Sequence, residues 1–134
     1  MKTKIVDNNQ INLVIDSLKK GECIAFKTDT IFGLSCIATD VNACKKIVEI
    51  KNRENKPLII LLKDKNDLQK YVKNISKRAQ KIIDKFWPGP LTIIFELNYP
   101  FCNEITCGKN TIAIRVPHHK LPQEILKNID SPLV

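Results

Sequence analysis

Apolar positions recur along this chain with two different spacings that alternate with each other. Residues at the 3.6-residue spacing of an amphipathic helix follow Asp7, Asp40, Ser76 and Pro122, and a shorter helix is indicated after Asp64. Short aliphatic runs between them favour strands at 23–26, 35–38, 58–62, 91–97 and 111–116. Strands that alternate with helices predict an α/β fold built on a twisted, mixed, open sheet with helices on both faces.

The predicted boundaries carry residues that suit them. Asp7 or Asn8, Asp40 and Ser76 can cap the helices that follow, and Gly21 suits the left-handed position after the first helix. Leu58–Leu62 is apolar throughout, as in a strand covered on both faces. No repeat, low-complexity tract or linker interrupts the 134 residues, so we expect a single domain.

A polar segment, Lys27-Thr28-Asp29-Thr30, lies between two of the predicted strands and is followed by Gly33. Small hydroxyl and carboxyl side chains at the end of a strand can present polar groups at the rim of a sheet, and a glycine lets the backbone turn or a ligand approach. Alternatively, the threonines are ordinary strand residues and Asp29 belongs to a turn.

The net charge of +8 suggests polyanionic partners such as nucleotides or RNA, although an evenly spread surface charge is an alternative. The longest aliphatic run, Leu58 to Leu62, is too short to cross a membrane, and the N-terminus shows no apolar signal segment. The chain has five cysteines and no CxxC pair, and we interpret most of them as small core residues that stay reduced. We therefore expect a cytoplasmic protein. Cys102 and Cys107 could pair or bind metal, but no ligand lies at zinc spacing around them.

Three cations, Lys51, Arg53 and Lys56, lie at a predicted helix end and in the loop that enters a buried strand. Arginine offers a planar fork for phosphate oxygens and lysine a mobile point charge. The alternative is a solvated basic helix terminus that the helix dipole favours. No P-loop or GxGxxG motif is present, so a bound nucleotide would be held mainly by such side chains.

Arg115 ends the predicted strand Thr111-Ile-Ala-Ile-Arg, where a full positive charge among aliphatic residues is unusual. It could hold a carboxylate with two hydrogen bonds, or simply extend into solvent from the sheet edge. The Trp87-Pro-Gly-Pro90 segment predicts a rigid turn from helix to strand, without chemistry of its own. His118 and His119 have no partner at catalytic or metal spacing, so we interpret them as surface residues.

Five ordered segments of this chain resemble the YrdC family, the threonylcarbamoyl-AMP synthases. They are Lys27 to Leu34, Lys51 to Leu58, Trp87 to Pro90, Thr111 to Arg115, and Pro132 to Val134. The first has lysine and aspartate where the family usually has proline and glutamate, and the second lacks the proline after Arg53. Archaeal members have a threonine-contacting histidine near the position of Leu61, so that role is not carried over.

The resemblance implies a nucleotidyltransferase that makes threonylcarbamoyl-AMP and pyrophosphate from L-threonine, bicarbonate and ATP, with Mg²⁺ accompanying ATP. The product serves threonylcarbamoyladenosine modification of tRNA through downstream transferase proteins. Lys51 and Arg53 would then be catalytic, and Arg53, Lys56, Thr111 and Lys51 would bind ATP. Thr30, Arg115 and Thr28 would bind threonine, and no protein-held metal is expected.

In the family, a serine- and asparagine-bearing segment follows the motif matched by Pro132-Leu133-Val134, so we expect residues 1–134 to be a C-terminally truncated YrdC-like domain. A fragment, a shortened gene product and a decayed copy all fit this pattern. The alternative function is a non-catalytic YrdC-like module that binds tRNA or double-stranded RNA. Low aromatic content, with no evident base-stacking platform, argues against it. A related domain of hydrogenase-maturation carbamoyl transferases is a third possibility, although nothing in the sequence suggests its partner domains.

Overall fold

A computed structural model describes residues 2–28 and 31–134. Five α-helices, two 3-10 helices and five strands follow one another within this part of the chain. In order they are η1 (Asn8–Gln10), α1 (Ile11–Lys19), β1 (Ile24–Lys27), β2 (Phe32–Ser35), α2 (Val41–Lys51), β3 (Ile59–Leu61), η2 (Lys65–Lys70), α3 (Lys77–Phe86), β4 (Ile93–Glu96), α4 (Asn103–Thr106), β5 (Thr111–Arg115) and α5 (Lys120–Ile129).

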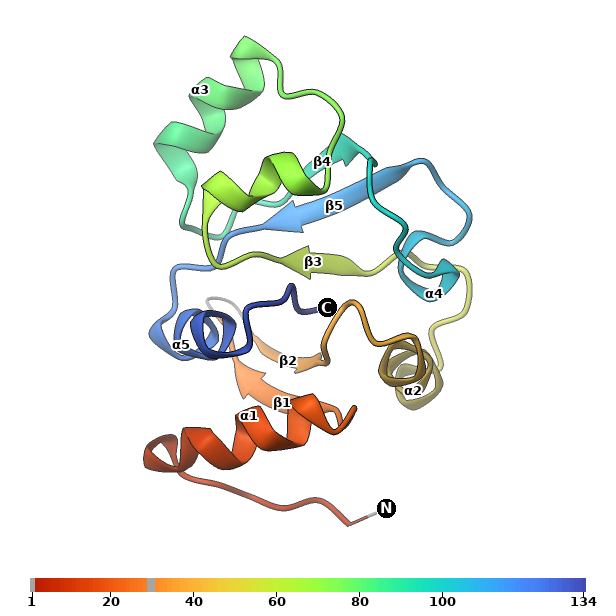
Figure 1. The fold of residues 1–134 in the computed structure, drawn as a ribbon, viewed down its shortest axis with the longest axis vertical. Helices are drawn as coiled ribbons and strands as arrows, with labels where there is room; N and C mark the ends of the chain where they lie inside the picture. The colour runs from red at the N-terminus through yellow and green to blue at the C-terminus, as the bar shows by residue number, and fades with distance from the viewer. Residues whose placement is uncertain (1, 29–30) are drawn as a thin grey trace.

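The strands form two sheets that the C-terminal residues connect. β1 and β2 are an antiparallel hairpin, and β5 lies between β3, its parallel neighbour, and β4, its antiparallel neighbour. Leu133 bridges both sheets because it pairs with Ile37 on one side and Leu61 on the other. Figure 1 shows the resulting order, with α1 below the hairpin, α3 at the opposite end, and the C-terminus between β3 and β2. The predicted mixed α/β architecture is confirmed.

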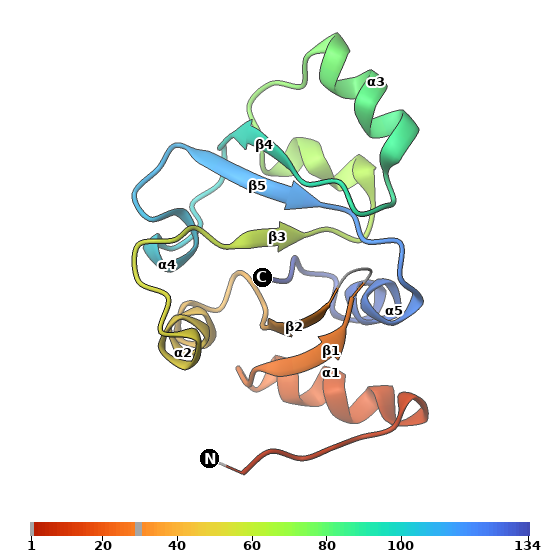
Figure 2. The same ribbon diagram turned by 180° about the vertical axis from the view of Figure 1, so that it is seen from behind.

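Helices cover the strands unequally. In Figure 1 the short helix η2 lies in front of β4, whereas the view from behind in Figure 2 shows no helix in front of β3 and β5. Exposure agrees with this picture, because Ile60 on β3 is fully buried while its neighbour Ile59 is 40% exposed. One face of the three-stranded sheet is therefore covered by helices, and the other is open where Ile59 lies. The expectation that the strand within Leu58–Leu62 is covered on both faces was wrong at Ile59.

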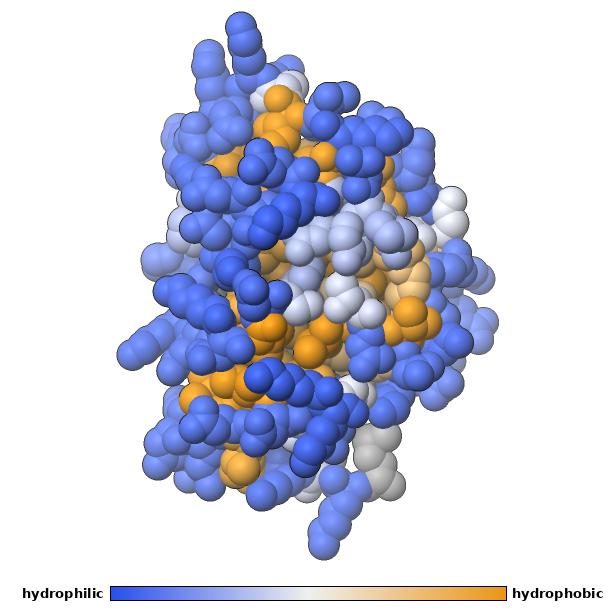
Figure 3. All heavy atoms as spheres, viewed as in Figure 1, coloured by the Kyte–Doolittle hydropathy of each residue, from blue (hydrophilic) through white to orange (hydrophobic). Residues whose placement is uncertain are grey.

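Two hydrophobic clusters stabilise the fold. The larger one joins α2, η2, α3 and α4 to the covered face of the three-stranded sheet through residues such as Ile47, Leu68, Ile83, Ile105 and Ile114. The smaller one packs α1 and α5 around Phe26 and Leu133. On the face drawn in Figure 3, hydrophilic side chains dominate, and apolar atoms gather in a strip near the level of α5.

Several capping predictions are confirmed. The side chains of Asp40 and Ser76 accept hydrogen bonds from Ala43 and Ala79 at the starts of α2 and α3. Gly21 has a φ of +77°, and its amide donates to the Leu18 carbonyl at the end of α1.

Other expectations were wrong in detail. The strand expected at 35–38 is β2 at Phe32–Ser35, because antiparallel pairing of Lys27 with Phe32 closes the hairpin early. Phe86 follows the buried Ile83 at helical spacing on α3, yet its side chain is 48% exposed. Between β4 and β5, where no helix was expected, lies the short helix α4, whose Ile105 is buried.

Candidate functional site

The open face of β5 carries the two polar residues that the sequence singled out on this strand. Thr111 and Arg115 are its first and last residues, four positions apart, so both side chains point to the same face. At a rise of about 3.3 Å per residue, their Cα atoms are about 13 Å apart. Both residues are partly exposed, whereas Ile112 and Ile114 between them point into the core and are buried.

An apolar row separates these two polar ends. Ala113 pairs with Ile59 of β3 on one side and with Ile94 of β4 on the other, so the three side chains lie side by side on the open face. Ile94 is 69% exposed and Ile59 is 40% exposed. The face therefore offers an apolar strip with a hydroxyl at one end and a guanidinium at the other.

The three predicted cations come together at the end of α2. Lys51 is the last residue of α2, and Asn52, with a φ of +46°, ends the helix in the left-handed conformation. Lys51, Asn52, Arg53 and Lys56 line a shallow hollow of about 400 Å³. The cluster is thus a single basic surface rather than three unrelated side chains.

Arg53 is the best-fixed member of this cluster. One of its terminal nitrogens, Nη2, donates to the Pro57 carbonyl at 3.4 Å, and its Nε is buried without a hydrogen-bond partner. The parallel pairing of β3 with β5 begins at Ile59 and Ala113, and the Leu58 amide donates instead to the Ile105 carbonyl of α4. Because β3 and β5 are parallel, the loop that holds Arg53 enters β3 at the end of the sheet where β5 begins. Arg53 keeps an unused donor there, which suits an anion.

The predicted site cations are not used in internal ion pairs. In the described part of the chain, every ion pair involves a lysine in or next to η2: Lys63, Lys65, Lys70 or Lys73. The hydrogen bond to Asp130 raises the pKa of Lys63, and the bond from Lys65 lowers the pKa of Asp84. Carboxylates therefore neutralise the η2 side of the molecule, whereas the described residues leave Lys51, Arg53, Lys56 and Arg115 without such a partner.

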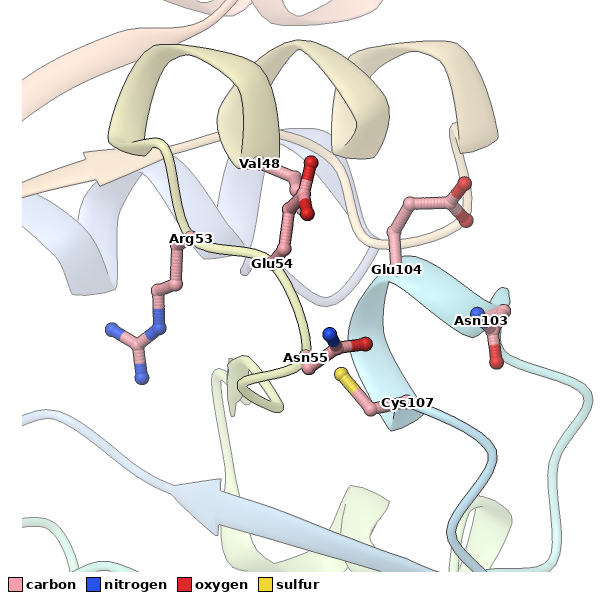
Figure 4. A pocket seen from close by; sticks show the side chains of 7 residues that line it. All are labelled: Val48, Arg53, Glu54, Asn55, Asn103, Glu104 and Cys107. Carbon is pink, nitrogen blue, oxygen red and sulfur yellow. The ribbon is translucent and has the colours of Figure 1, made fainter.

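A second hollow lies on the other side of Arg53 and has different chemistry. It is lined by Val48, Arg53, Glu54, Asn55, Asn103, Glu104 and Cys107. In Figure 4 the guanidinium of Arg53 points away from Glu54 and Glu104, so the carboxylates and the cation are segregated. Among residues 2–28 and 31–134, no group of three or more potential ligands could hold a metal ion.

Two of the three predicted threonine-binding residues, Thr28 and Thr30, belong to the segment between β1 and β2. The Thr28 backbone amide donates to the Ile31 carbonyl, and its hydroxyl accepts from the Ile31 amide, so Thr28 closes the turn. Asp29 and Thr30 lie outside the described residues, and the assignment of Thr30 stays a prediction.

The cysteines and His119 have contacts that stabilise the fold. All five cysteines are free, and Cys36 and Cys44 are buried with their sulfurs 3.8 Å apart. The neighbouring Cys36 thiol and burial raise the pKa of Cys44, and burial raises the pKa of Cys102 to about 12. The His119 side chain accepts from the Leu121 amide at the start of α5, so this histidine caps a helix.

One residue of the site was missed by the sequence analysis. The Nε of Arg115 donates to the Thr92 hydroxyl at 2.9 Å, across the β4–β5 pair. Antiparallel pairing of the two predicted strands could have indicated this contact, because it places a residue at the start of β4 opposite the end of β5. The register, however, depends on the turn before β4, which the sequence does not specify.

Comparisons with known proteins agree on one family. The sequence model of the Sua5/YciO/YrdC domain, described as telomere recombination, matches residues 16–134. A threonylcarbamoyl-AMP synthase of Pyrococcus abyssi is 32% identical over 96% of this chain and 38% of its own length. A putative threonylcarbamoyl-AMP synthase of Methanocaldococcus jannaschii is 39% identical over 93% of this chain and 64% of its own length. The chain thus spans less than two thirds of either relative.

Solved structures share the same fold. The P. abyssi Sua5 protein complexed with L-threonine superposes with a TM-score of 0.89 at 31% identity, covering 97% of this chain and 38% of that one. Escherichia coli YciO gives a TM-score of 0.83 at 23% identity, covering 97% of this chain and 64% of that one, and this likeness concerns the fold alone. In the described residues, no helix is long and apolar enough to span a membrane.

Proposed function

Because this chain belongs to the Sua5/YciO/YrdC family, we propose that it carries the nucleotide- and threonine-binding surface of a threonylcarbamoyl-AMP synthase. The observation that carries the proposal is the open face of β5, which has Thr111 at its start and Arg115 at its end. The basic cluster lies in the segment that enters the parallel strand β3 at the end of the sheet where β5 begins. The similarity to a Sua5 protein complexed with L-threonine supports the choice of amino acid.

The proposed reaction has two steps. The amine of L-threonine and bicarbonate combine to a carbamate with loss of water, and a carbamate oxygen then attacks the α-phosphorus of ATP. Pyrophosphate leaves, and threonylcarbamoyl-AMP remains. No protein nucleophile is required, so the chain contributes mainly position and charge.

Each predicted residue has a place in this scheme. Arg53, fixed at Pro57 with a buried unpartnered Nε, stabilises charge on the phosphates together with Lys51. Lys56 and Thr111 bind ATP, which arrives with Mg²⁺. Arg115 binds the threonine carboxylate, and Thr28 and Thr30 bind the remainder of the amino acid.

A distance argument supports this division of roles. The span of about 13 Å between Thr111 and Arg115 leaves room for an amino acid at one end and a triphosphate at the other. The carbamate would then meet the α-phosphate above the row formed by Ile59, Ala113 and Ile94, where fewer competing water molecules bind.

Nucleotide binding tests the basic cluster separately from catalysis. We expect titration of the chain with MgATP, followed by calorimetry, to show binding that Arg53→Ala weakens about 10- to 100-fold, the range for a hydrogen bond to a charged group. Arg78 on α3 is exposed and distant in the fold, so Arg78→Ala is the matched control. Equal losses in both variants would refute a specific role for Arg53.

The product, threonylcarbamoyl-AMP, would then be used by downstream transferase proteins to modify tRNA. Direct contact with tRNA or double-stranded RNA stays a prediction, and three of the aromatic rings offer little support for it. Tyr71, Tyr99 and Phe101 pack on one another with centroids 4.6–5.7 Å apart, so their faces are largely used internally.

A further inference from the structure

Arg115 is anchored through one edge of its guanidinium. Its Nε donates to the Thr92 hydroxyl at 2.9 Å, and the described residues give it no other hydrogen bond and no ion pair. A hydrogen bond at Nε leaves the edge formed by the two terminal nitrogens available for a carboxylate. A free arginine side chain samples many rotamers, so an anchor at Nε reduces the conformational entropy that is lost when a ligand binds.

Thr92 is itself held by the turn that precedes it. The indole Nε1 of Trp87 donates to the carbonyl of Leu91 at 2.7 Å, next to Thr92. The amide of Gly89 donates to the carbonyl of Val116 at 2.9 Å, next to Arg115. The turn therefore ties the start of β4 to the end of β5, where the two side chains meet.

The turn tolerates little change at its centre. A Cβ atom on Gly89 would lie 2.3 Å from the Phe86 carbonyl oxygen, far inside contact distance. Threonine adds rigidity at position 92, because a β-branched side chain has few χ1 rotamers. The Trp87-Pro-Gly-Pro90 segment, interpreted from the sequence as structure only, thus controls the geometry of a charged residue on the open face.

We propose that Thr92 is a positioning residue that orients the Arg115 guanidinium toward the carboxylate of the amino-acid substrate, and that the Trp87–Pro90 turn sets its place. This inference rests on the proposed function, in which Arg115 binds L-threonine. Thr92 acts through Arg115 and need not touch the substrate.

Thr92→Val tests the proposal, because valine keeps the shape and removes the hydroxyl. We expect calorimetric titration with L-threonine to show affinity about tenfold weaker in Thr92→Val, the loss of one hydrogen bond to a charged group, and within about threefold of wild type in Thr92→Ser. Thr39→Val, at an exposed position between β2 and α2, is the matched control and should bind as wild type does. Unchanged affinity in Thr92→Val would overturn the proposal.

A second readout does not depend on threonine binding. The chain has three arginines, Arg53, Arg78 and Arg115, so Arg115→Lys identifies the Arg115 Nε–H signal in a proton–nitrogen NMR spectrum. We expect this proton to exchange slowly with water in wild type and Thr92→Ser, and rapidly in Thr92→Val. Rapid exchange in the wild type would overturn the anchor, even if Thr92→Val failed to fold.

The two readouts separate the inference from its premise. Suppose that wild type does not bind L-threonine although Thr92 protects the Arg115 Nε–H from exchange. The hydrogen bond between Thr92 and Arg115 is then confirmed, but the proposed function is wrong, and the positioning role is overturned with it. If wild type binds L-threonine and Thr92→Val binds equally well, the proposed function stands and the inference alone is wrong.

Discussion

Leu133 lies buried between the two sheets, so its truncation should lower the free energy of unfolding more than truncation of an exposed leucine does. The side chain is fully buried in the cluster formed with Leu18, Phe26 and α5. Its backbone exchanges two hydrogen bonds with Leu61, at 2.8 and 3.1 Å, on the edge of β3. Leu133→Ala keeps these backbone bonds and removes only the packing.

The expected loss can be worked out from this burial. Leucine to alanine removes three carbon atoms, which at about 0.8 kcal/mol per buried CH₂ gives about 2.4 kcal/mol. The cavity left among fixed neighbours raises the total to about 3–5 kcal/mol. A domain of this kind has a free energy of unfolding of about 5–15 kcal/mol, so the variant should still fold in water.

Urea unfolding followed by circular dichroism measures this loss. With a slope of about 2 kcal/mol/M, the midpoint should fall by about 2 M. Leu13→Ala on α1, where the leucine is 40% exposed, is the matched control and should lose less than about 1 kcal/mol. If the two variants lost the same stability, Leu133 would not be the packed link between the sheets, and the reasoning would be refuted.

Other consequences of the structure can be measured in the same way. Gly89→Ala should lower stability by about 1–3 kcal/mol because its Cβ would collide with the Phe86 carbonyl, and a thermal melt as stable as wild type would contradict the described turn. The pKa of Cys44 is raised, which means that the folded chain favours the protonated thiol. The contribution of this thiol to the free energy of unfolding is therefore fully present below pH 9.0, the ordinary pKa of a cysteine, and falls as the pH rises above that value. Urea midpoints at pH about 8 and about 10 should show this fall, and Cys44→Ala should reduce it. Arg53→Ala should weaken MgATP binding about 10- to 100-fold in a calorimetric titration, whereas Arg78→Ala should bind MgATP as wild type does.

Much of the fold could be predicted from the sequence because its signals are local. Asp40 and Ser76 cap helices by bonds to residues three positions away, and Gly21 ends α1 through its own backbone. Such contacts are encoded within one turn of helix. The start of β2 was misplaced because it depends on pairing with β1, which the local sequence does not encode.

The sequence was enough to predict which residues form the site, but it was not enough to predict how they are arranged. The sequence identified Lys51, Arg53, Lys56 and Arg115 as unusual cations, and the structure adds that none of them has a carboxylate partner among the described residues. Thr92 could not be found in this way, because its contact with Arg115 spans 23 positions and depends on strand register.

The central claim is that this chain presents a surface for ATP and L-threonine on the open face of β5. The most direct measurement incubates the 134-residue chain with MgATP, L-threonine and isotopically labelled bicarbonate, and detects threonylcarbamoyl-AMP by mass. Labelled product that requires both threonine and bicarbonate, and that Arg53→Ala suppresses, is the result predicted here. A folded chain that binds neither MgATP nor L-threonine and makes no product would contradict the account.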